Sequence, residues 1–164
     1  MASFTVSPAL TTSVEIMKGA LSAVLGFPLG RSTVGVKFSE GNKVRLTVST
    51  KPRGQAPTPE EMTKVMEVVA GKVAEDAPVY VVMVQRPQAE DLYGDCMYDK
   101  FEVPESVTEL RLVYLESFSL HCSPHPVLPS CAGVGNVQLL KHKFRATKME
   151  LELQFVVEPT GEAV

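Results

Sequence analysis

Metal-binding side chains gather in one short segment, residues 121–125, which reads His-Cys-Ser-Pro-His. Two of the three histidines and one of the three cysteines lie within these five positions. Imidazole and thiolate groups are common zinc ligands, and a zinc site needs about four ligands, or about three and a water molecule. The segment therefore predicts half of a metal site, with His121, Cys122 and His125 as its ligands.

The remaining ligands must come from elsewhere in the chain. The third histidine is His142, and no His-x3-His pair occurs. Because Pro124 and Pro126 flank His125, we expect a loop and not a helix around it. Two alternatives stay open at this point. Either the loop and a distant carboxylate hold zinc, or these side chains line a pocket without any metal or other cofactor.

Length and composition favour one ordinary globular unit. The chain has 164 residues, which predicts a single domain over 1–164. Its apolar content of 45% and charged content of 21% are usual for water-soluble proteins. Three cysteines at irregular spacing do not form a disulfide framework, so reduced thiols and a cytoplasmic location are expected.

Neither a membrane segment nor a targeting signal is predicted. No apolar run approaches the roughly 20 residues of a membrane-spanning helix, and the first 13 residues lack a basic stretch before a long apolar one. The net charge of -3 argues against a wholly basic nucleic-acid-binding domain. No number of subunits is predicted.

One basic cluster stands out near the C-terminal end. Lys141, Lys143 and Arg145 point to the same face if this segment is a strand. Such a face can meet RNA phosphates, which supply much of the affinity for nucleic acids. With only Phe144 nearby, base stacking is not indicated. The alternative is a solvated outer surface without a partner.

Hydrophobic periodicity and helix-capping residues outline the elements. Helices are expected after Ser7-Pro8 up to Gly26, from Thr58-Pro59 to about residue 75, and over 87–93. Strands are expected at 33–38, 43–49, 79–84, 109–116 and in the pair that spans 137–158, with 79–84 as a buried strand because it is continuously apolar. This order predicts an α+β fold with two layers, in which helices cover one face of a mostly antiparallel sheet.

Two polar residues of the first helix deserve a functional interpretation. Thr11 and Glu15 are four residues apart and therefore share a helix face. A carboxylate at this place could ligate zinc or act as a general base on water. The alternative is that both residues belong to a solvated polar flank of the helix.

Five segments carry a resemblance to a known family: the helix segment 11–21, the run Glu-Asp-Ala-Pro-Val at 75–79, MYDKFEVPESV at 97–107, LESFSLHC at 115–122 and the strand pair at 137–158. Together they resemble the small freestanding alanyl-tRNA editing proteins, which are relatives of the editing domain of alanyl-tRNA synthetase. The run at 97–107 is similar to the shortest archaeal members. The resemblance covers about residues 8–158 and implies the fold of that editing domain.

The resemblance also implies a chemistry, the hydrolysis of Ser-tRNA(Ala) in trans by a zinc site. The zinc of the family is bound by a His-x3-His pair on the first helix and a Cys-x3-His pair in a late loop. The helix pair falls on Thr11 and Glu15. The late pair falls on Ser123 and Val127, or on Cys122 and Pro126 after a one-residue gap. The metal site of the family is thus altered in this chain.

Roles for further residues come from the same resemblance. The glycine motif of the family falls on residues 131–135, so backbone N–H groups near Gly133 and Gly135 would stabilise the oxyanion. A family threonine that recognises the serine hydroxyl falls near Ser32 or Thr33, which with Thr11 would bind the substrate.

Two functions follow as hypotheses. The first is an aminoacyl-tRNA deacylase in which Glu15 is catalytic, alone or with a displaced zinc held by Glu15, His121, Cys122 and His125, and in which Lys141, Lys143 and Arg145 bind tRNA, by resemblance tRNA(Ala). The second is a catalytically inactive module that binds tRNA or a protein on the same scaffold.

Overall fold

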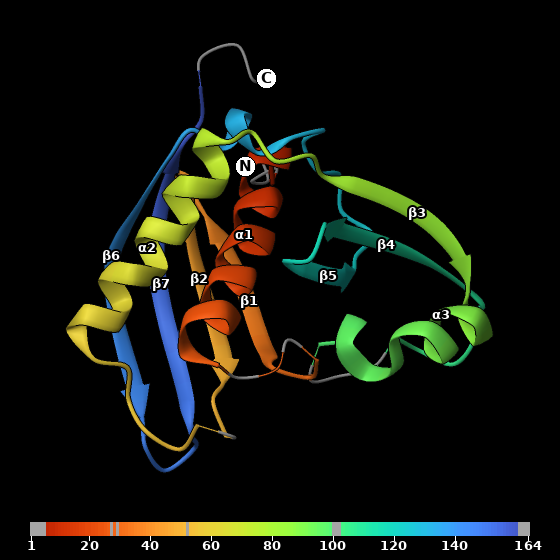
Figure 1. The fold of residues 1–164 in the computed structure, drawn as a ribbon, viewed down its shortest axis with the longest axis horizontal. Coiled ribbons are helices and arrows are strands. Elements are labelled where there is room, and N and C mark those ends of the chain that lie inside the picture. Colours follow the sequence, from red (N-terminus) through yellow and green to blue (C-terminus); the bar gives the residue numbers. More distant parts are fainter. Residues whose placement is uncertain (1–5, 27, 29, 52, 100–102, 161–164) are drawn as a thin grey trace.

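The computed structural model describes residues 6–26, 28, 30–51, 53–99 and 103–160. The chain combines helices with antiparallel strands, which confirms the α+β class (Figure 1). The strands form two separate sheets, where the sequence predicted one. A four-stranded sheet has the order β1-β2-β7-β6, and a three-stranded sheet has the order β3-β4-β5.

The larger sheet is built from the strands that the sequence predicted at 33–38, at 43–49 and in the pair that spans 137–158. Its members are β1 (Thr33–Ser39), β2 (Lys43–Ser49), β6 (Asn136–Arg145) and β7 (Glu150–Glu158). All three strand pairs are antiparallel. The inner face is apolar, and Leu46 of β2 lies directly opposite Leu153 of β7. The outer face therefore receives the polar and charged residues of the same strands.

Two helices cover the inner face of the larger sheet, namely α1 (Pro8–Leu25) and α2 (Pro59–Ala74). The hydroxyl of Ser7 accepts a hydrogen bond from the Leu10 N–H, as the predicted cap requires. Thr58 and Glu61 form the predicted capping box of α2. None of the helices in the described part of the chain is long and apolar enough to cross a membrane.

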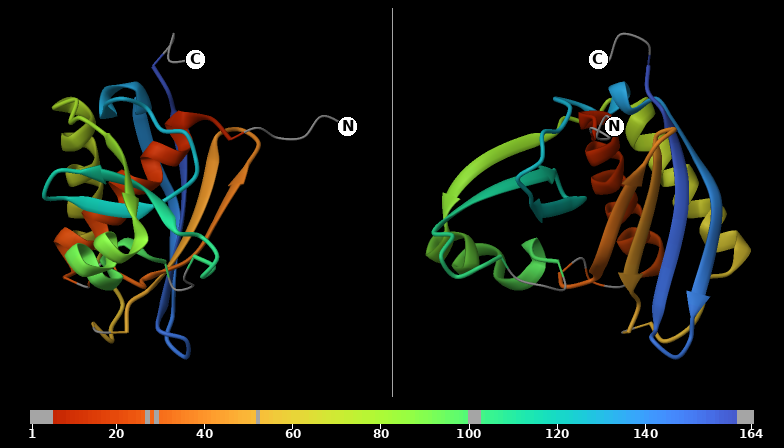
Figure 2. Two further views of the ribbon diagram at one scale, coloured as in Figure 1. Left: turned by 90° about the vertical axis from the view of Figure 1, so that its right-hand side faces the viewer. Right: turned by 180° about the vertical axis from the view of Figure 1, so that it is seen from behind.

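The smaller sheet consists of β3 (Tyr80–Gln85), β4 (Glu109–Leu115) and β5 (Ser119–Cys122). Its outer side is covered by α3 (Arg86–Tyr93) and the short 3-10 helix η1 (Gly94–Met97) (Figure 2). The strand β5 was expected to be part of a loop. The prediction that 79–84 is buried is wrong, because β3 pairs with β4 on one side only and leaves Val81 and Met83 42% and 56% exposed.

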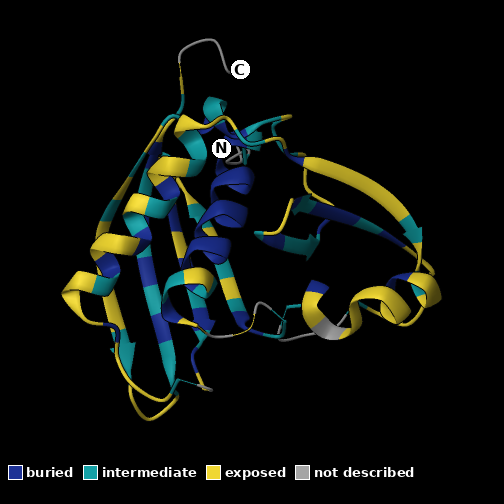
Figure 3. Cartoon of the chain, in the orientation of Figure 1, coloured by how far each residue is buried: buried dark blue, intermediate teal, exposed yellow. Residues whose placement is uncertain are grey.

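The helix α1 is buried on nearly all sides, because the larger sheet packs on one side of it and β4 and β5 lie on another (Figure 3). Thr11, Glu15 and Lys18 retain only 6%, 4% and 6% of their exposure. The alternative of a solvated polar flank is therefore wrong for Thr11 and Glu15. Buried polar groups need partners, and those of α1 define the site below.

Candidate functional site

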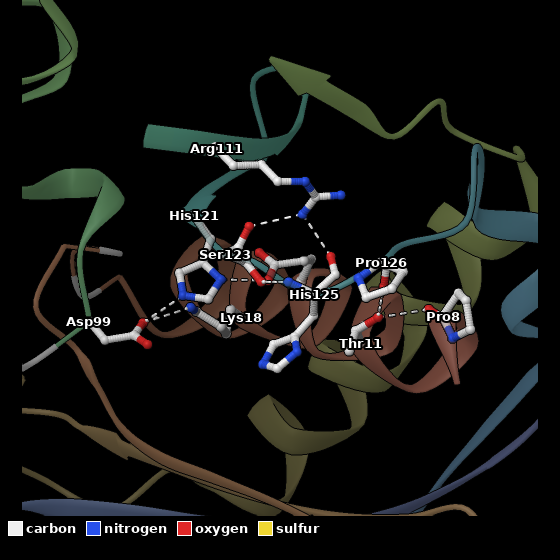
Figure 4. Close-up of polar contacts among 10 residues, drawn as sticks. Pro8, Thr11, Lys18, Asp99, Arg111, His121, Ser123, His125 and Pro126 are labelled. Atoms are coloured by element: carbon white, nitrogen blue, oxygen red, sulfur yellow. Dashed lines mark hydrogen bonds and ion pairs between the residues drawn. The ribbon is translucent and has the colours of Figure 1, made fainter. Parts of the chain in front are cut away.

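A half-buried histidine connects two carboxylates from distant parts of the chain. Glu15 comes from the middle of α1, His121 from β5, and Asp99 from the segment after η1. The Nδ1 atom of His121 lies 2.7 Å from Glu15 Oε2, and its Nε2 atom lies 3.0 Å from Asp99 Oδ1. Both ring nitrogens therefore face an acceptor, and the imidazole is held in one orientation (Figure 4).

Lys18 completes this network. It lies three residues after Glu15 on the same side of α1, and its Nζ atom lies 3.2 Å from Asp99 Oδ1. Two cationic and two anionic side chains thus balance one another at the centre of the molecule. Neither Lys18 nor Asp99 was among the candidate site residues of the sequence. The available signal was the three-residue spacing of Glu15 and Lys18 on one apolar helix.

The network fixes the protonation states of its members. Burial and the charge of Lys18 would lower the pKa of His121, but the charge of Glu15 and the hydrogen bonds to Asp99 and Glu15 outweigh these effects and raise the pKa to about 9. Burial opposes the charge of Glu15, yet attraction to His121 and Lys18 holds its pKa below the usual value. Burial likewise opposes the charge of Asp99, but the His121 hydrogen bond and Lys18 lower its pKa to about 2. At neutral pH the imidazole is therefore an imidazolium.

A pocket of about 250 Å³ opens beside this network, between α1, β1 and the loop after β5. Its polar lining consists of Thr11, Glu15, Thr33, Asp99, His121, Ser123 and His125. Five of these were candidate site residues of the sequence, namely Thr11, Glu15, Thr33, His121 and His125. The apolar part of the lining comes mainly from β1, with Val36 and Phe38.

Two buried oxygens of the pocket lining have no hydrogen-bond partner among the described residues. They are Oε1 of Glu15 and Oγ1 of Thr33, and the two side chains are 4% and 2% exposed. An unpartnered buried polar atom costs about 1–3 kcal/mol of stability. Such groups occur at strained or catalytic sites and where a water molecule or an ion supplies the missing partner. The two oxygens are therefore the candidates for polar contact with a bound molecule.

The loop that forms one wall of the pocket is anchored at both of its ends. Thr11 Oγ1 donates to the carbonyl of Pro126 over 2.5 Å, and Thr12 Oγ1 accepts from the Leu128 N–H over 2.9 Å. On the other side, Nη1 of Arg111 donates to the carbonyls of Ser123 and His125 over 2.9 and 2.7 Å (Figure 4). Thr11 therefore stabilises the loop that forms the wall of the pocket, because its hydroxyl group donates its hydrogen to that loop.

Some predicted site residues lie elsewhere. Side chains alternate along β5, so Cys122 points away from His121 and packs with the apolar cluster beneath α3. Gly133 and Gly135 belong to the end of the 3-10 helix η2 (Cys131–Val134) and do not line the pocket, and the Gly135 N–H donates to the Ala132 carbonyl. Ser32 is buried beside Thr33 without lining the pocket.

The basic cluster is also remote from the pocket lining. Lys141, Lys143 and Arg145 lie on β6 and face outward from the larger sheet, where they line a shallow hollow with Arg45. They share no lining residue with the pocket beside Glu15. Any role in binding tRNA would thus concern its phosphates and not the reacting ester.

The pocket does not fit the zinc that the editing family uses. Within the described residues, no group of three histidine, cysteine or acidic side chains is arranged to hold a metal ion. Both nitrogens of His121 face carboxylates, whereas a metal ligand must keep one nitrogen free for the ion. Cys122 lies on the opposite face of its sheet.

No protein-family model matches the chain. The likeness to the alanyl-tRNA editing family accordingly rests on sequence segments between residues 8 and 158. In the structure, several positions that match the family's metal ligands lie close together. Thr11, Glu15 and Ser123, on which three of the family's metal-ligand positions fall in the ungapped register, line one pocket together with Thr33.

Proposed function

We propose that this protein is of the aminoacyl-tRNA editing type and hydrolyses the ester of a mischarged tRNA in the pocket between α1 and β1. By resemblance, the substrate is Ser-tRNA(Ala). The observation that supports the proposal most is the pair of unpartnered buried oxygens on Glu15 and Thr33. By resemblance, Glu15 falls on a metal-ligand position of the family, and Thr33 falls near the family threonine that recognises the serine hydroxyl.

The chemistry assigned to Glu15 is general base catalysis without metal. Its Oε2 atom accepts from His121, and its Oε1 atom, which has no partner among the described residues, is the oxygen assigned to the water molecule. As this water attacks the ester carbonyl carbon, its proton passes to Glu15. The bond to the ribose oxygen then breaks, and the proton moves from Glu15 to that leaving oxygen. His121 holds Glu15 in position and is itself not the base, because it is already protonated.

The role of Thr33 leads to a sharp expectation for Thr33→Val. Valine is similar in shape and removes a buried hydroxyl without a partner, so the free energy of unfolding should stay the same or rise. The affinity for a stable analogue, adenosine that carries serine through a 3′ amide, should fall about tenfold, since a hydrogen bond is lost. Isothermal titration calorimetry measures the affinity, and chemical denaturation measures the stability.

The matching control is the alanyl form of the same analogue, which lacks the hydroxyl. Its affinity should be equal for the wild type and Thr33→Val. An equal loss for both analogues, or a clear loss of stability, would contradict the assigned role of Thr33 in recognising the ligand.

One observation favours a second candidate, the catalytically inactive module. The lowered pKa of Glu15 makes it a weak base, and the raised pKa of His121 keeps that ring protonated at neutral pH. An efficient general base has a pKa near the working pH. A wild-type protein that binds the seryl amide and leaves Ser-tRNA(Ala) intact would support this second candidate.

A further inference from the structure

The outer face of the larger sheet carries six cationic side chains from three of its four strands. We call it the basic face, and it consists of Lys37, Lys43, Arg45, Lys141, Lys143 and Arg145. The helices lie behind this face in the right-hand view of Figure 2, so nothing in the described chain covers it. The net charge of the whole chain is -3, which makes this concentration of positive charge a local feature.

The strand register places three of these cations, Lys37, Arg45 and Lys141, in one row across the sheet, with Gln154 between the last two. Lys37 of β1 lies opposite Arg45 of β2, Arg45 lies opposite Gln154 of β7, and Gln154 lies opposite Lys141 of β6. Neighbouring strands are about 4.8 Å apart, so the row crosses the sheet over roughly 14 Å. Two hollows of about 250 and 310 Å³ lie on either side of Arg45 and are lined by members of the basic face.

The charge of the basic face is only partly neutralised. The carboxylates on this face all come from β7. The central one, Glu152, forms ion pairs with both arginines, at 3.0 Å to Arg145 and 3.9 Å to Arg45. The other two, Glu150 and Glu158, lie at the ends of the strand. The four lysines make no ion pair with any residue that the structure describes. They are therefore available to an anionic partner.

We propose that the basic face binds the phosphate backbone of a double-stranded RNA, namely the acceptor arm of the tRNA whose aminoacyl end enters the pocket. The identity of this RNA rests on the proposed function. The strand β1 connects the two places, because Val36 lines the pocket while the adjacent Lys37 belongs to the basic face. A single-stranded 3′ end can thus pass over β1 from the basic face to the pocket.

The composition of the face favours a duplex over other polyanions. The aromatic rings of these strands, Phe38, Phe144 and Phe155, pack toward the core, so no ring is offered for the base stacking that binds single strands. The only large apolar side chain exposed on the described part of these strands is Leu140, which is a poor anchor for a membrane surface. Phosphate contacts by lysine remain as the mode of recognition.

The test is binding of a fluorescent RNA hairpin with the sequence of the acceptor arm, followed by anisotropy at several salt concentrations. Lys143→Glu should weaken binding about tenfold at low salt. Lys64→Glu is the matched control, because Lys64 is an exposed lysine of α2 on the opposite side of the sheet, and it should change binding less than about twofold. Removing all four lysines by Lys→Gln should reduce the salt dependence by the equivalent of about four phosphate contacts.

Other outcomes would overturn the proposal. Equal effects of Lys143→Glu and Lys64→Glu would do so, as would binding to anionic phosphatidylserine vesicles without binding to the hairpin.

Hydrolysis assays distinguish a failure of the RNA-binding proposal from a failure of the proposed deacylase function. If the wild type cleaves both Ser-tRNA(Ala) and 3′-seryl-adenosine, the four-lysine variant should lose activity on the tRNA only. If no ester is cleaved, loss of hairpin binding in that variant still supports the basic face as an RNA site.

Discussion

Replacing His121 with alanine is expected to lower the free energy of unfolding by about 3–5 kcal/mol, the usual cost of removing one partner of a buried ion pair. The physical reason is that Glu15 is 4% exposed and its Oε2 atom would lose the His121 contact, the one hydrogen bond it has among the described residues. Chemical denaturation near pH 6 measures the change. The control is His142→Ala on β6, an exposed site where the change should stay within about 0.5 kcal/mol.

A second substitution tests the cause of this loss. If an unpaired carboxylate is responsible, then neutralising it by Glu15→Gln in the His121→Ala background should restore part of the stability. The double variant would then be more stable than His121→Ala alone. A further loss of stability in the double variant would show that the alanine acts through a lost packing contact and not through the charge of Glu15.

The stability of the wild type should fall when the pH rises above neutral. The pKa of His121 is about 9 in the folded protein and 6.5 as the ordinary value. A group with a raised pKa stabilises the fold fully below its unfolded pKa and loses this contribution as the pH rises through the folded one. Between pH 6.5 and pH 9 the wild type should therefore lose most of about 3 kcal/mol.

The comparison with His121→Gln isolates this titration, because other groups that titrate in the same range are common to both proteins. The difference in unfolding free energy between the two should shrink from pH 6.5 to pH 9. The carboxylates act in the opposite direction. The pKa of Asp99 is lowered from 3.8 to about 2, so its contribution is present above pH 3.8 and is lost as the pH falls through 2. A constant difference from pH 6.5 to pH 9 would contradict the imidazolium.

Local patterns were sufficient to predict most elements, for physical reasons that are visible in particular residues. Thr58, Pro59 and Glu61 form a capping box whose bonds involve neighbours in sequence. The alternation of Leu151, Leu153 and Phe155 reflects a sheet with one buried face. Such signals are complete within a few residues and do not depend on the rest of the fold.

Interactions between distant segments could not be predicted in this way. The apolar run at 79–84 gives no sign that β3 lies at the edge of a small second sheet. The same sheet buries the polar side of α1 and turns His121 toward Glu15, 106 positions away in sequence. The pairing of Asp99 with Lys18 likewise joins segments 81 positions apart. The sequence therefore indicated Glu15, Thr33 and His121 as candidates without showing that they share a pocket.

The glycine motif illustrates the limit of transfer by resemblance. Gly135 has a φ of 72° and lies so close to the Glu158 carbonyl that a Cβ atom would clash with it. The turn into β6 and the close contact with the end of β7 therefore require glycine at position 135. This requirement explains the residue without any role in stabilising an oxyanion. Gly133 and Gly135 are also absent from the pocket lining.

The most direct test of the proposed deacylase activity is hydrolysis of Ser-tRNA(Ala) by the purified wild type, with and without a strong chelator. We expect hydrolysis above the buffer blank that the chelator does not change. We also expect a loss of about a hundredfold or more in Glu15→Gln and no loss in Glu67→Gln, an exposed glutamate of α2. No hydrolysis above the blank, or full activity in Glu15→Gln, would contradict metal-free general base catalysis by Glu15.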